Sequence, residues 1–269
     1  MYGNGELSET ESCALTFLDY GTMETVYLCE QINCDHSNYL TEDEQPCFAY
    51  GKEILPVLYG GRLYWFCDSS TVSGGKLQNS LTLMSSEPFG LSEKEICKID
   101  GLTLDFSASA YMKNGVLYFF PYEQETDENN VVTNKFSYHL ASLELSSGKY
   151  TDLGVQGTQE PSIKGFYDDK FYFDDNVFNV KNKSVSANET PHNDGETVIS
   201  DDYYAYNSGE NIEILCAGGK DKKIILSDAV NIESIIVDHR LFMSKNSGTE
   251  WYYYDLTEEA PAKHDITAN

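Results

Sequence analysis

Short runs of aromatic and aliphatic residues, each introduced by a polar turn, recur along the chain. The pattern is found as GGRLYWF (60–66), KNGVLYFF (113–120), YDDKFYF (167–173), SDDYYAY (200–206) and DHRLFMS (238–244). Glycine, asparagine and aspartate accept positive φ angles and close tight hairpins, so each copy predicts a turn followed by a strand. No segment sustains an apolar period of 3.6 residues, so we expect an all-β chain.

A turn and further strand-like residues follow each of these runs, as in the strand–turn–strand pattern YHLASLELSSGKYTDL (138–153). Each unit therefore predicts about four short antiparallel strands, the content of one β-propeller blade. Five such units and a partial first unit, CALTFLDYGTMETVYLC (13–29), predict a six-bladed propeller. Five or seven blades, or a β-sandwich with similar hairpins, are the alternatives.

The predicted propeller is a single domain over residues 1–269. Its units are expected at about 1–54, 55–104, 105–159, 160–195, 196–230 and 231–269. Two polar stretches, 71–80 and 123–135, are expected to be loops inserted between strands. The acidic pairs Asp168/Asp169, Asp174/Asp175 and Asp201/Asp202 have the residue types of calcium ligands, but they recur at turn positions and are expected to be solvated hairpin turns.

Charge and hydropathy narrow the classes of partner. The chain has 44 acidic and 18 basic residues, a formal net charge of −26. Such a field repels phosphate backbones and anionic lipids, so we expect neither nucleic acid nor direct docking on a membrane surface. No apolar run is long enough for a transmembrane helix. The first residues do not read as a secretory leader, so the chain is expected to be either cytosolic or a mature portion whose leader lies outside this sequence.

The acidic, turn-rich segment at residues 29–47, CEQINCDHSNYLTEDEQPC, contains three cysteines and a histidine. Cys29, Cys34, His36 and Cys47 offer thiolates and an imidazole, the ligands that tetrahedral zinc prefers. Their spacing, C-x4-C-x-H-x10-C, is looser than a C-x2-C knuckle. In an oxidising compartment a cysteine pair would favour a disulfide that staples the segment, whereas a reducing compartment favours zinc, and free thiols are the third alternative. In each case the segment is expected to be structural, and no catalytic residue is predicted.

Taken together, the blade entries and the segment Tyr-Leu-Cys-x4-Cys-x-His resemble a propeller-type domain of unknown function from secreted lipoproteins of anaerobic Gram-positive bacteria. That domain is distantly similar to low-density-lipoprotein-receptor propellers. The resemblance covers nearly the whole chain. It implies an extracytoplasmic protein, lipid-anchored through an N-terminal segment outside this sequence, and it implies no activity.

These observations predict an extracytoplasmic, non-catalytic binding or scaffold propeller whose ligand is an unknown protein or glycan. The alternative is a carbohydrate-binding or carbohydrate-active propeller in nutrient capture, and a third interpretation is a sensor domain that presents a loop surface to a protein. Arg62 and Arg240, the only arginines, occupy the same position of the repeat, immediately before its first strand. They are candidate ligands for an anion at the channel rim, with pairing to local carboxylates as the competing interpretation. No cofactor is expected other than zinc at residues 29–47.

Overall fold

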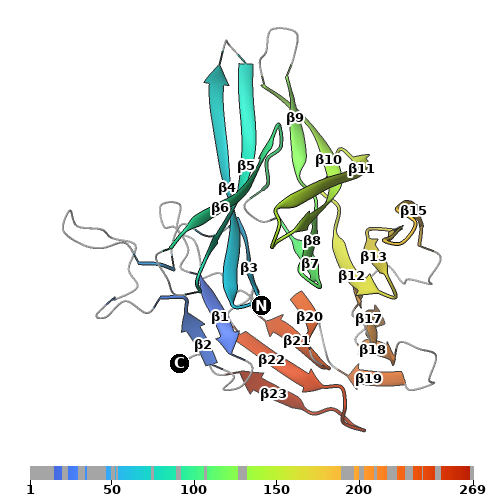
Figure 1. Ribbon diagram of the computed structural model, residues 1–269. Coiled ribbons are helices and arrows are strands. Elements are labelled where there is room, and N and C mark those ends of the chain that lie inside the picture. Colours follow the sequence, from blue (N-terminus) through green and yellow to red (C-terminus); the bar gives the residue numbers. More distant parts are fainter. Residues whose placement is uncertain are drawn as a thin grey trace. The chain divides into compact units, whose positions relative to one another are not determined.

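The structure is a computed structural model in which every regular element is a β-strand (Figure 1). It describes residues 15–19, 24–29, 34, 47–49, 52, 54–73, 76–88, 92–105, 108–126, 132–188, 197–199, 203–208, 211–216, 223–227, 233–237, 239–245 and 250–266. The chain divides into two compact units, which are described separately. The first comprises Met1–Gly5, Phe17–Val26 and Ile163–Asn269, and the second comprises Glu6–Thr16 and Tyr27–Ser162.

The second unit contains two antiparallel sheets that follow the order of the chain. The first sheet consists of β3 (Ile54–Tyr59), β4 (Arg62–Ser73), β5 (Lys76–Ser86) and β6 (Lys94–Asp100). The second consists of β7 (Ala110–Lys113), β8 (Val116–Phe119), β10 (Val132–Glu144) and β11 (Lys149–Gly157), with β9 (Tyr122–Thr126) paired to the far end of β10. A four-stranded meander of this kind is the structural unit of a propeller blade.

The first unit contains three more meanders. They are β12 (Ile163–Tyr167), β13 (Lys170–Phe173), β14 (Asn176–Asn179) and β15 (Ser184–Ala187); β16 (Thr197–Ile199), β17 (Tyr203–Ser208), β18 (Asn211–Cys216) and β19 (Lys223–Ser227); and β20 (Glu233–Val237), β21 (Arg240–Lys245), β22 (Glu250–Asp255) and β23 (Lys263–Ile266). Strands β12 and β16, the first of consecutive meanders, pair in parallel at Gly165 and Ile199. Side-by-side parallel first strands are what neighbouring blades present around a propeller axis.

A short hairpin of β1 (Thr16–Asp19) and β2 (Glu24–Tyr27) precedes the meanders. Among the described residues, no helix is long and apolar enough to cross a membrane. The predicted all-β chain built from propeller-type blades is therefore confirmed, whereas the number of six blades and the unit boundaries stay predictions.

Three of the five recurring polar turns are tight hairpins, as predicted, whereas residues 200–202 and Asp238 lie outside the described residues. Both central residues have positive φ at Gly60–Gly61, Asn114–Gly115 and Asp168–Asp169, which defines two-residue type I′ turns. The acidic residues at 168 and 169 therefore serve the turn. Each of these turns joins the first strand of a meander to the second. The expectation that Arg62 and Arg240 precede the first strand was wrong, because they begin the second strands β4 and β21.

The apolar residues that align across the repeats are the core of their sheets. Leu63, Leu117, Phe171, Tyr203 and Leu241 are between 0% and 8% exposed. Burial of each such side chain contributes about 1.5–3 kcal/mol relative to exposure. In the second unit the two sheets share one core, in which the rings of Phe66 and Phe119 lie 5.3 Å apart.

The two polar stretches expected to be loops are mainly strands instead. Strands β4 and β5 stay paired out to Ser73 and Lys76, and β9 pairs with β10 out to Thr126 and Val132 (Figure 1). Polar side chains hold the long β4–β5 hairpin together, since the hydroxyls of Ser69 and Ser80 lie 2.8 Å apart. The hairpin extends past the core, so it needs no apolar face there, and the alternation that identifies a half-buried strand is missing.

Candidate functional site

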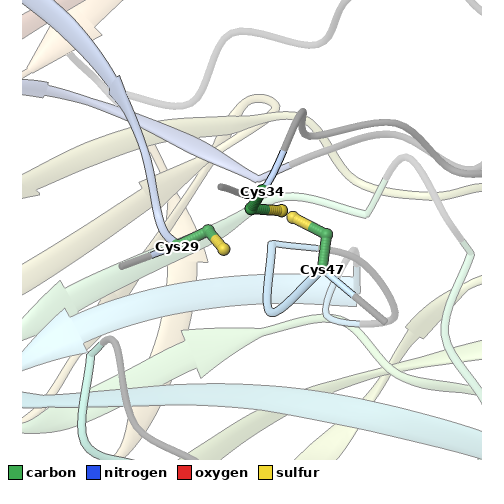
Figure 2. A group of neighbouring side chains, drawn as sticks. All are labelled: Cys29, Cys34 and Cys47. Carbon is green, nitrogen blue, oxygen red and sulfur yellow. The ribbon is translucent and has the colours of Figure 1, made fainter. Parts of the chain in front are cut away.

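Three of the four predicted metal ligands come together in the structure. Cys29 follows β2, and Cys34 and Cys47 lie at the two ends of the segment 35–46. Their Sγ atoms all lie within 4.8 Å of one another, and their side chains point toward a common centre (Figure 2). We call these three residues the thiol cluster. His36 lies outside the described residues.

Backbone hydrogen bonds position two of the three cysteines. The Leu28 N–H donates to the Leu15 carbonyl at 3.0 Å, and the Leu15 N–H donates to the Ala49 carbonyl at 2.7 Å. All three of these residues are buried. Cys29 adjoins Leu28 and Cys47 precedes Ala49 by two residues, so the thiols are brought together by a framework that does not depend on a bond between them.

Cys47 is the most enclosed member of the thiol cluster, at 5% exposure. Burial raises the pKa of its thiol to about 12, and its hydrogen bonds with the Cys29 and Cys34 thiols act in the same direction. A hydrogen bond from the Ala49 backbone acts in the opposite direction and lowers this pKa, because it favours the thiolate. The Cys47 thiol is thus protonated at neutral pH.

A buried lysine anchors the turn that carries Cys47. Lys52 Nζ donates to the Phe48 carbonyl at 3.1 Å and lies 3.0 Å from Glu93 Oε1. The same ammonium lies 5.0 Å from the centre of the Trp65 ring, on β4. These contacts tie the turn at residues 47–49 to the β3–β6 sheet, so the position of Cys47 is set by the blade as well as by the framework at Leu15.

The two arginines predicted to bind an anion have partners in their own sheets. Arg62 Nε donates to Ser85 Oγ at 2.8 Å, across the β4–β5 pair. Arg240 lies opposite Asp255 on β22, and its guanidinium carbon is 5.5 Å from the Tyr253 ring centre. The arginines belong to different units, so their role as a pair stays a prediction.

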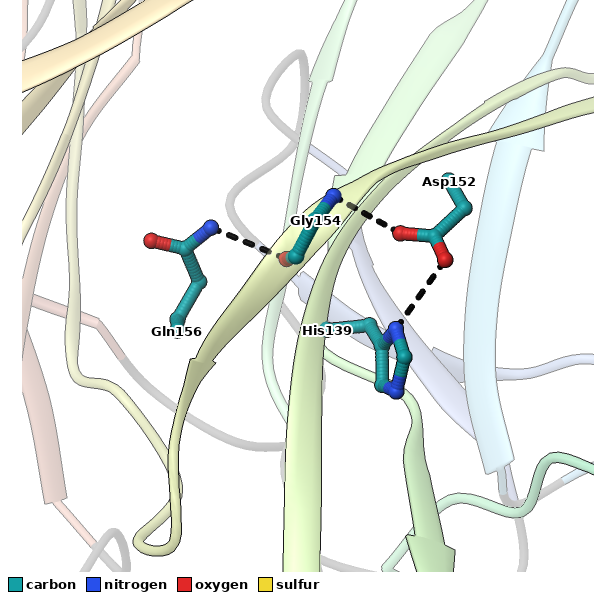
Figure 3. Close-up of polar contacts among 4 residues, drawn as sticks. All are labelled: His139, Asp152, Gly154 and Gln156. Atoms are coloured by element: carbon teal, nitrogen blue, oxygen red, sulfur yellow. Dashed lines mark hydrogen bonds and ion pairs between the residues drawn. The ribbon is translucent and has the colours of Figure 1, made fainter.

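A histidine–aspartate pair that was not predicted lies on β10 and β11 (Figure 3). His139 Nδ1 is 3.1 Å from Asp152 Oδ2, and the other oxygen of that carboxylate accepts the Gly154 N–H at 2.7 Å. The pairing of β10 with β11 shifts register on both sides of His139, which re-aims this side chain. The signal available in the sequence was a histidine in the apolar phase of the alternating run YHLASLEL.

Two polar atoms near this pair have no hydrogen-bond partner among the described residues. They are His139 Nε2 and the Tyr150 hydroxyl, both buried. Burial raises the pKa of Tyr150, with the negative charges of Asp152 and Glu123 acting in the same direction. The Tyr150 hydroxyl is therefore neutral, and both atoms face the interior of the sheet.

A second polar cluster surrounds Asp105. Tyr122 donates to its Oδ1 at 3.3 Å and Tyr138 donates to its Oδ2 at 3.1 Å. Burial raises the pKa of Glu160, and the charge of Asp105 raises it further. The two tyrosine rings also contact each other, with centroids 5.2 Å apart, so the cluster joins the start of β9 to the middle of β10.

Comparisons with known proteins leave the function open. No protein-family model matches the chain, and no curated protein matches it. Among solved structures, the β-propeller domain of the Trilobed protease from Pyrococcus furiosus is similar, with 12% identity over 77% of this chain and 69% of that chain and a TM-score of 0.43. A GH43 endo-arabinanase from Bacillus licheniformis is similar with 12% identity over 78% of this chain and 91% of that chain, at a TM-score of 0.31.

A chain of a nidogen/laminin complex is similar with 8% identity over 98% of this chain and 91% of that chain, at a TM-score of 0.26. At these identities and TM-scores the likenesses carry no argument about activity or ligand.

Proposed function

We infer that this protein is an extracytoplasmic, non-catalytic binding or scaffold propeller of a bacterial surface lipoprotein, and that its ligand is another protein. The observation that carries this proposal is a pair of exposed apolar side chains on the outer strands of one blade. Leu215 on β18 and Ile225 on β19 are 41% and 54% exposed. The other face of the same strands is apolar and buried.

The strand register places these two side chains together. Ile225 pairs with Glu213, and Leu215 is two residues further along β18, so both project from the same face as diagonal neighbours. Exposed aliphatic side chains that neighbour one another on a sheet favour a protein partner, because burial in an interface removes them from water. Outer strands also expose Val155 on β11 and Val185 on β15.

A photo-crosslinking amino acid at position 225 tests this proposal in the cells that produce the protein. We expect one discrete crosslinked product after illumination, reduced when Leu215→Glu is introduced in the same chain. Position 186 on β15, an exposed serine of the same unit, is the control and should give no such product. No product at position 225, or the same product at both positions, contradicts a protein partner at this surface.

The extracytoplasmic location has its own test. A membrane-impermeant, amine-reactive label applied to intact cells should modify Lys181, whose side chain is 75% exposed. A cytosolic protein in the same cells should stay unlabelled. Modification of this lysine only after lysis would contradict an extracytoplasmic location.

A glycan ligand is the second candidate, favoured by Tyr59 at the end of β3. A Cβ on Gly115 would lie 2.6 Å from Tyr59 Cε1, so the ring rests directly on the backbone of the neighbouring blade's turn. The tyrosine is still 37% exposed. An aromatic ring held in place and open to solvent suits stacking against a sugar.

Glycan-array binding distinguishes this second candidate. We expect Tyr59→Ala to abolish any binding, whereas Tyr27→Ala, a change at another exposed tyrosine of the same unit, should retain it. Equal loss in both variants, or no binding by the unaltered protein, would exclude Tyr59 as a sugar platform.

A further inference from the structure

We propose that Cys29, Cys34 and Cys47 form a binding site for one Zn²⁺ ion, with all three sulfurs as ligands. The proposal is independent of the binding surface at Leu215 and Ile225. It selects between the alternatives that the sequence left open, a disulfide and a metal.

The first argument is the geometry of the sulfur atoms. A disulfide joins two sulfurs at about 2 Å and leaves a third thiol without a role. Three thiolates on one zinc ion, at about 2.3 Å each, form a triangle with edges of about 3.8 Å. The three Sγ atoms here all lie within 4.8 Å of one another, so no edge exceeds that of the zinc-bound triangle by more than about 1 Å.

The second argument is the rigidity of the frame that holds the thiol cluster. The chain of hydrogen bonds from Leu28 through Leu15 to Ala49 joins three segments that are far apart in sequence. Lys52 then holds the turn after Cys47 through the Phe48 carbonyl. Metal sites need ligands preset by surrounding hydrogen bonds, and this frame supplies them without using the thiols.

The third argument is the hydrogen bond between the Ala49 backbone and the Cys47 sulfur. A hydrogen bond donated to sulfur stabilises a thiolate and does nothing for a disulfide. Zinc binds thiolates, so each thiol of the cluster would release its proton to solvent as the metal binds.

The fourth argument is the soft character of the ligand set. Thiolates select zinc and copper(I) over magnesium and calcium, which prefer oxygen. The ion would cross-link Cys29, which follows β2, to Cys47 in the turn that precedes β3.

Metal titration of the whole reduced chain tests the proposal, with Zn²⁺ and Co²⁺ as the probes. We expect one metal ion per chain and a thiolate-to-cobalt charge-transfer band in the near ultraviolet. Cys29→Ser, Cys34→Ser and Cys47→Ser should each lower the zinc affinity by roughly 100-fold or more, given that even outer partners of metal ligands matter 10–100-fold. Cys67→Ser, at an exposed cysteine of the same unit outside the cluster, should bind as the unaltered protein does.

Alkylation of the unaltered protein keeps the test valid even if the serine variants do not fold. Zinc should protect Cys29, Cys34 and Cys47 from iodoacetamide, and a chelator should restore their reaction. Cys67 should show the same reactivity in both states. Failure of the reduced chain to take up either metal, equal protection of Cys67, or metal uptake that survives all three substitutions would overturn the proposal.

Discussion

His139 and Asp152 form a hydrogen-bonded pair in which only one nitrogen of the imidazole has a partner among the described residues. Nδ1 lies 3.1 Å from the carboxylate, while Nε2 is buried with no partner among the described residues. An ionised carboxylate only accepts hydrogen bonds, so Nδ1–H is the donor to Asp152. His139 is 7% exposed, whereas the Asp152 side chain is 47% exposed and in contact with water.

The asymmetry of this pair predicts unequal effects of removing its two members. Asp152→Ala leaves a buried Nδ1–H without an acceptor, so we expect it to lower the free energy of unfolding by about 1–3 kcal/mol. His139→Phe removes both buried nitrogens and leaves a carboxylate that water can reach, so it should lower the free energy of unfolding by less. Urea denaturation measures both. Asp100→Ala, at an exposed position of the same unit, is the control, and an equal effect of Asp100→Ala and Asp152→Ala would contradict the prediction.

The contact of Tyr59 with Gly115 predicts an unusually costly glycine substitution. Gly115→Ala places a methyl group 2.6 Å from the ring and also requires an alanine at φ +76°. The positive φ alone costs about 1–2 kcal/mol. Gly60→Ala, at φ +58° with nothing within 4 Å, isolates that backbone cost. Thermal unfolding should show the larger loss for Gly115→Ala, and Tyr59→Ala in the same chain should recover part of the difference. Equal losses for the two glycines would show that the ring yields freely.

Lys52 is expected to contribute far more to the stability of the fold than an exposed lysine such as Lys98. Lys52→Met keeps the apolar stem but removes a buried ammonium from the Phe48 carbonyl and from Glu93, so we expect a loss of about 1–3 kcal/mol. Lys98→Met is the matched change, because Lys98 and its partner Asp100 are exposed and such pairs contribute about 0–1 kcal/mol. Denaturant midpoints measure both, and similar losses would show that the Lys52 contacts are not stabilising.

Asp255 predicts a pH-dependent contribution to stability. Thr257 donates to its Oδ1 from both the hydroxyl, at 2.6 Å, and the backbone N–H, at 3.0 Å, and these bonds hold the pKa of the carboxyl below its usual range. A lowered pKa in the folded state stabilises the fold above the unfolded pKa, near 3.9, and this stabilisation is lost as the pH falls through the folded pKa. Thr257→Ala should therefore destabilise the protein at pH 7 and have progressively less effect below about pH 4.

Unfolding measured across this pH range tests the assignment to Asp255. In Asp255→Asn the carboxyl is absent, so the effect of Thr257→Ala should no longer vary with pH. A pH-dependent effect that persists in the asparagine background would assign it to another group.

His36 is predicted to supply the fourth ligand of the proposed zinc site. It follows Cys34 by two residues, and zinc bound by protein takes four ligands. His36→Ala should weaken zinc binding by roughly 10–100-fold. His264→Ala is the control, because His264 lies on β23 and stacks on Tyr253. Unchanged zinc affinity in His36→Ala would show that a different group or water completes the site.

The blades could be predicted from the sequence because the same turn and strand motif recurs along the chain. Gly60–Gly61 and Asp168–Asp169 have the residue types that type I′ turns need, and Leu63 and Phe171 are the buried residues that follow them. These features depend on neighbours a few residues away, so local rules predict them. The position of each motif within its blade was predicted wrongly, because a turn motif does not show whether a paired strand precedes it.

The thiol cluster could be predicted only in part from neighbouring residues along the chain. The sequence identified the ligand types at Cys29, Cys34 and Cys47 from their proximity along the chain. Their convergence depends on the hydrogen bonds at Leu15, which come from a different segment. No spacing rule contains that contact, so the choice between one close pair and three neighbouring sulfurs needed the folded chain.

By itself the sequence determined the all-β class, the hairpin turns, the aromatic core positions and the acidic surface, because each follows from composition or from contacts between near neighbours. Only the tertiary structure decided that Arg62 begins a second strand, that residues 71–73 and 76–80 belong to paired strands, and that His139 meets Asp152. Those outcomes depend on strand register, and a register shift such as the one beside His139 turns a side chain to a new partner.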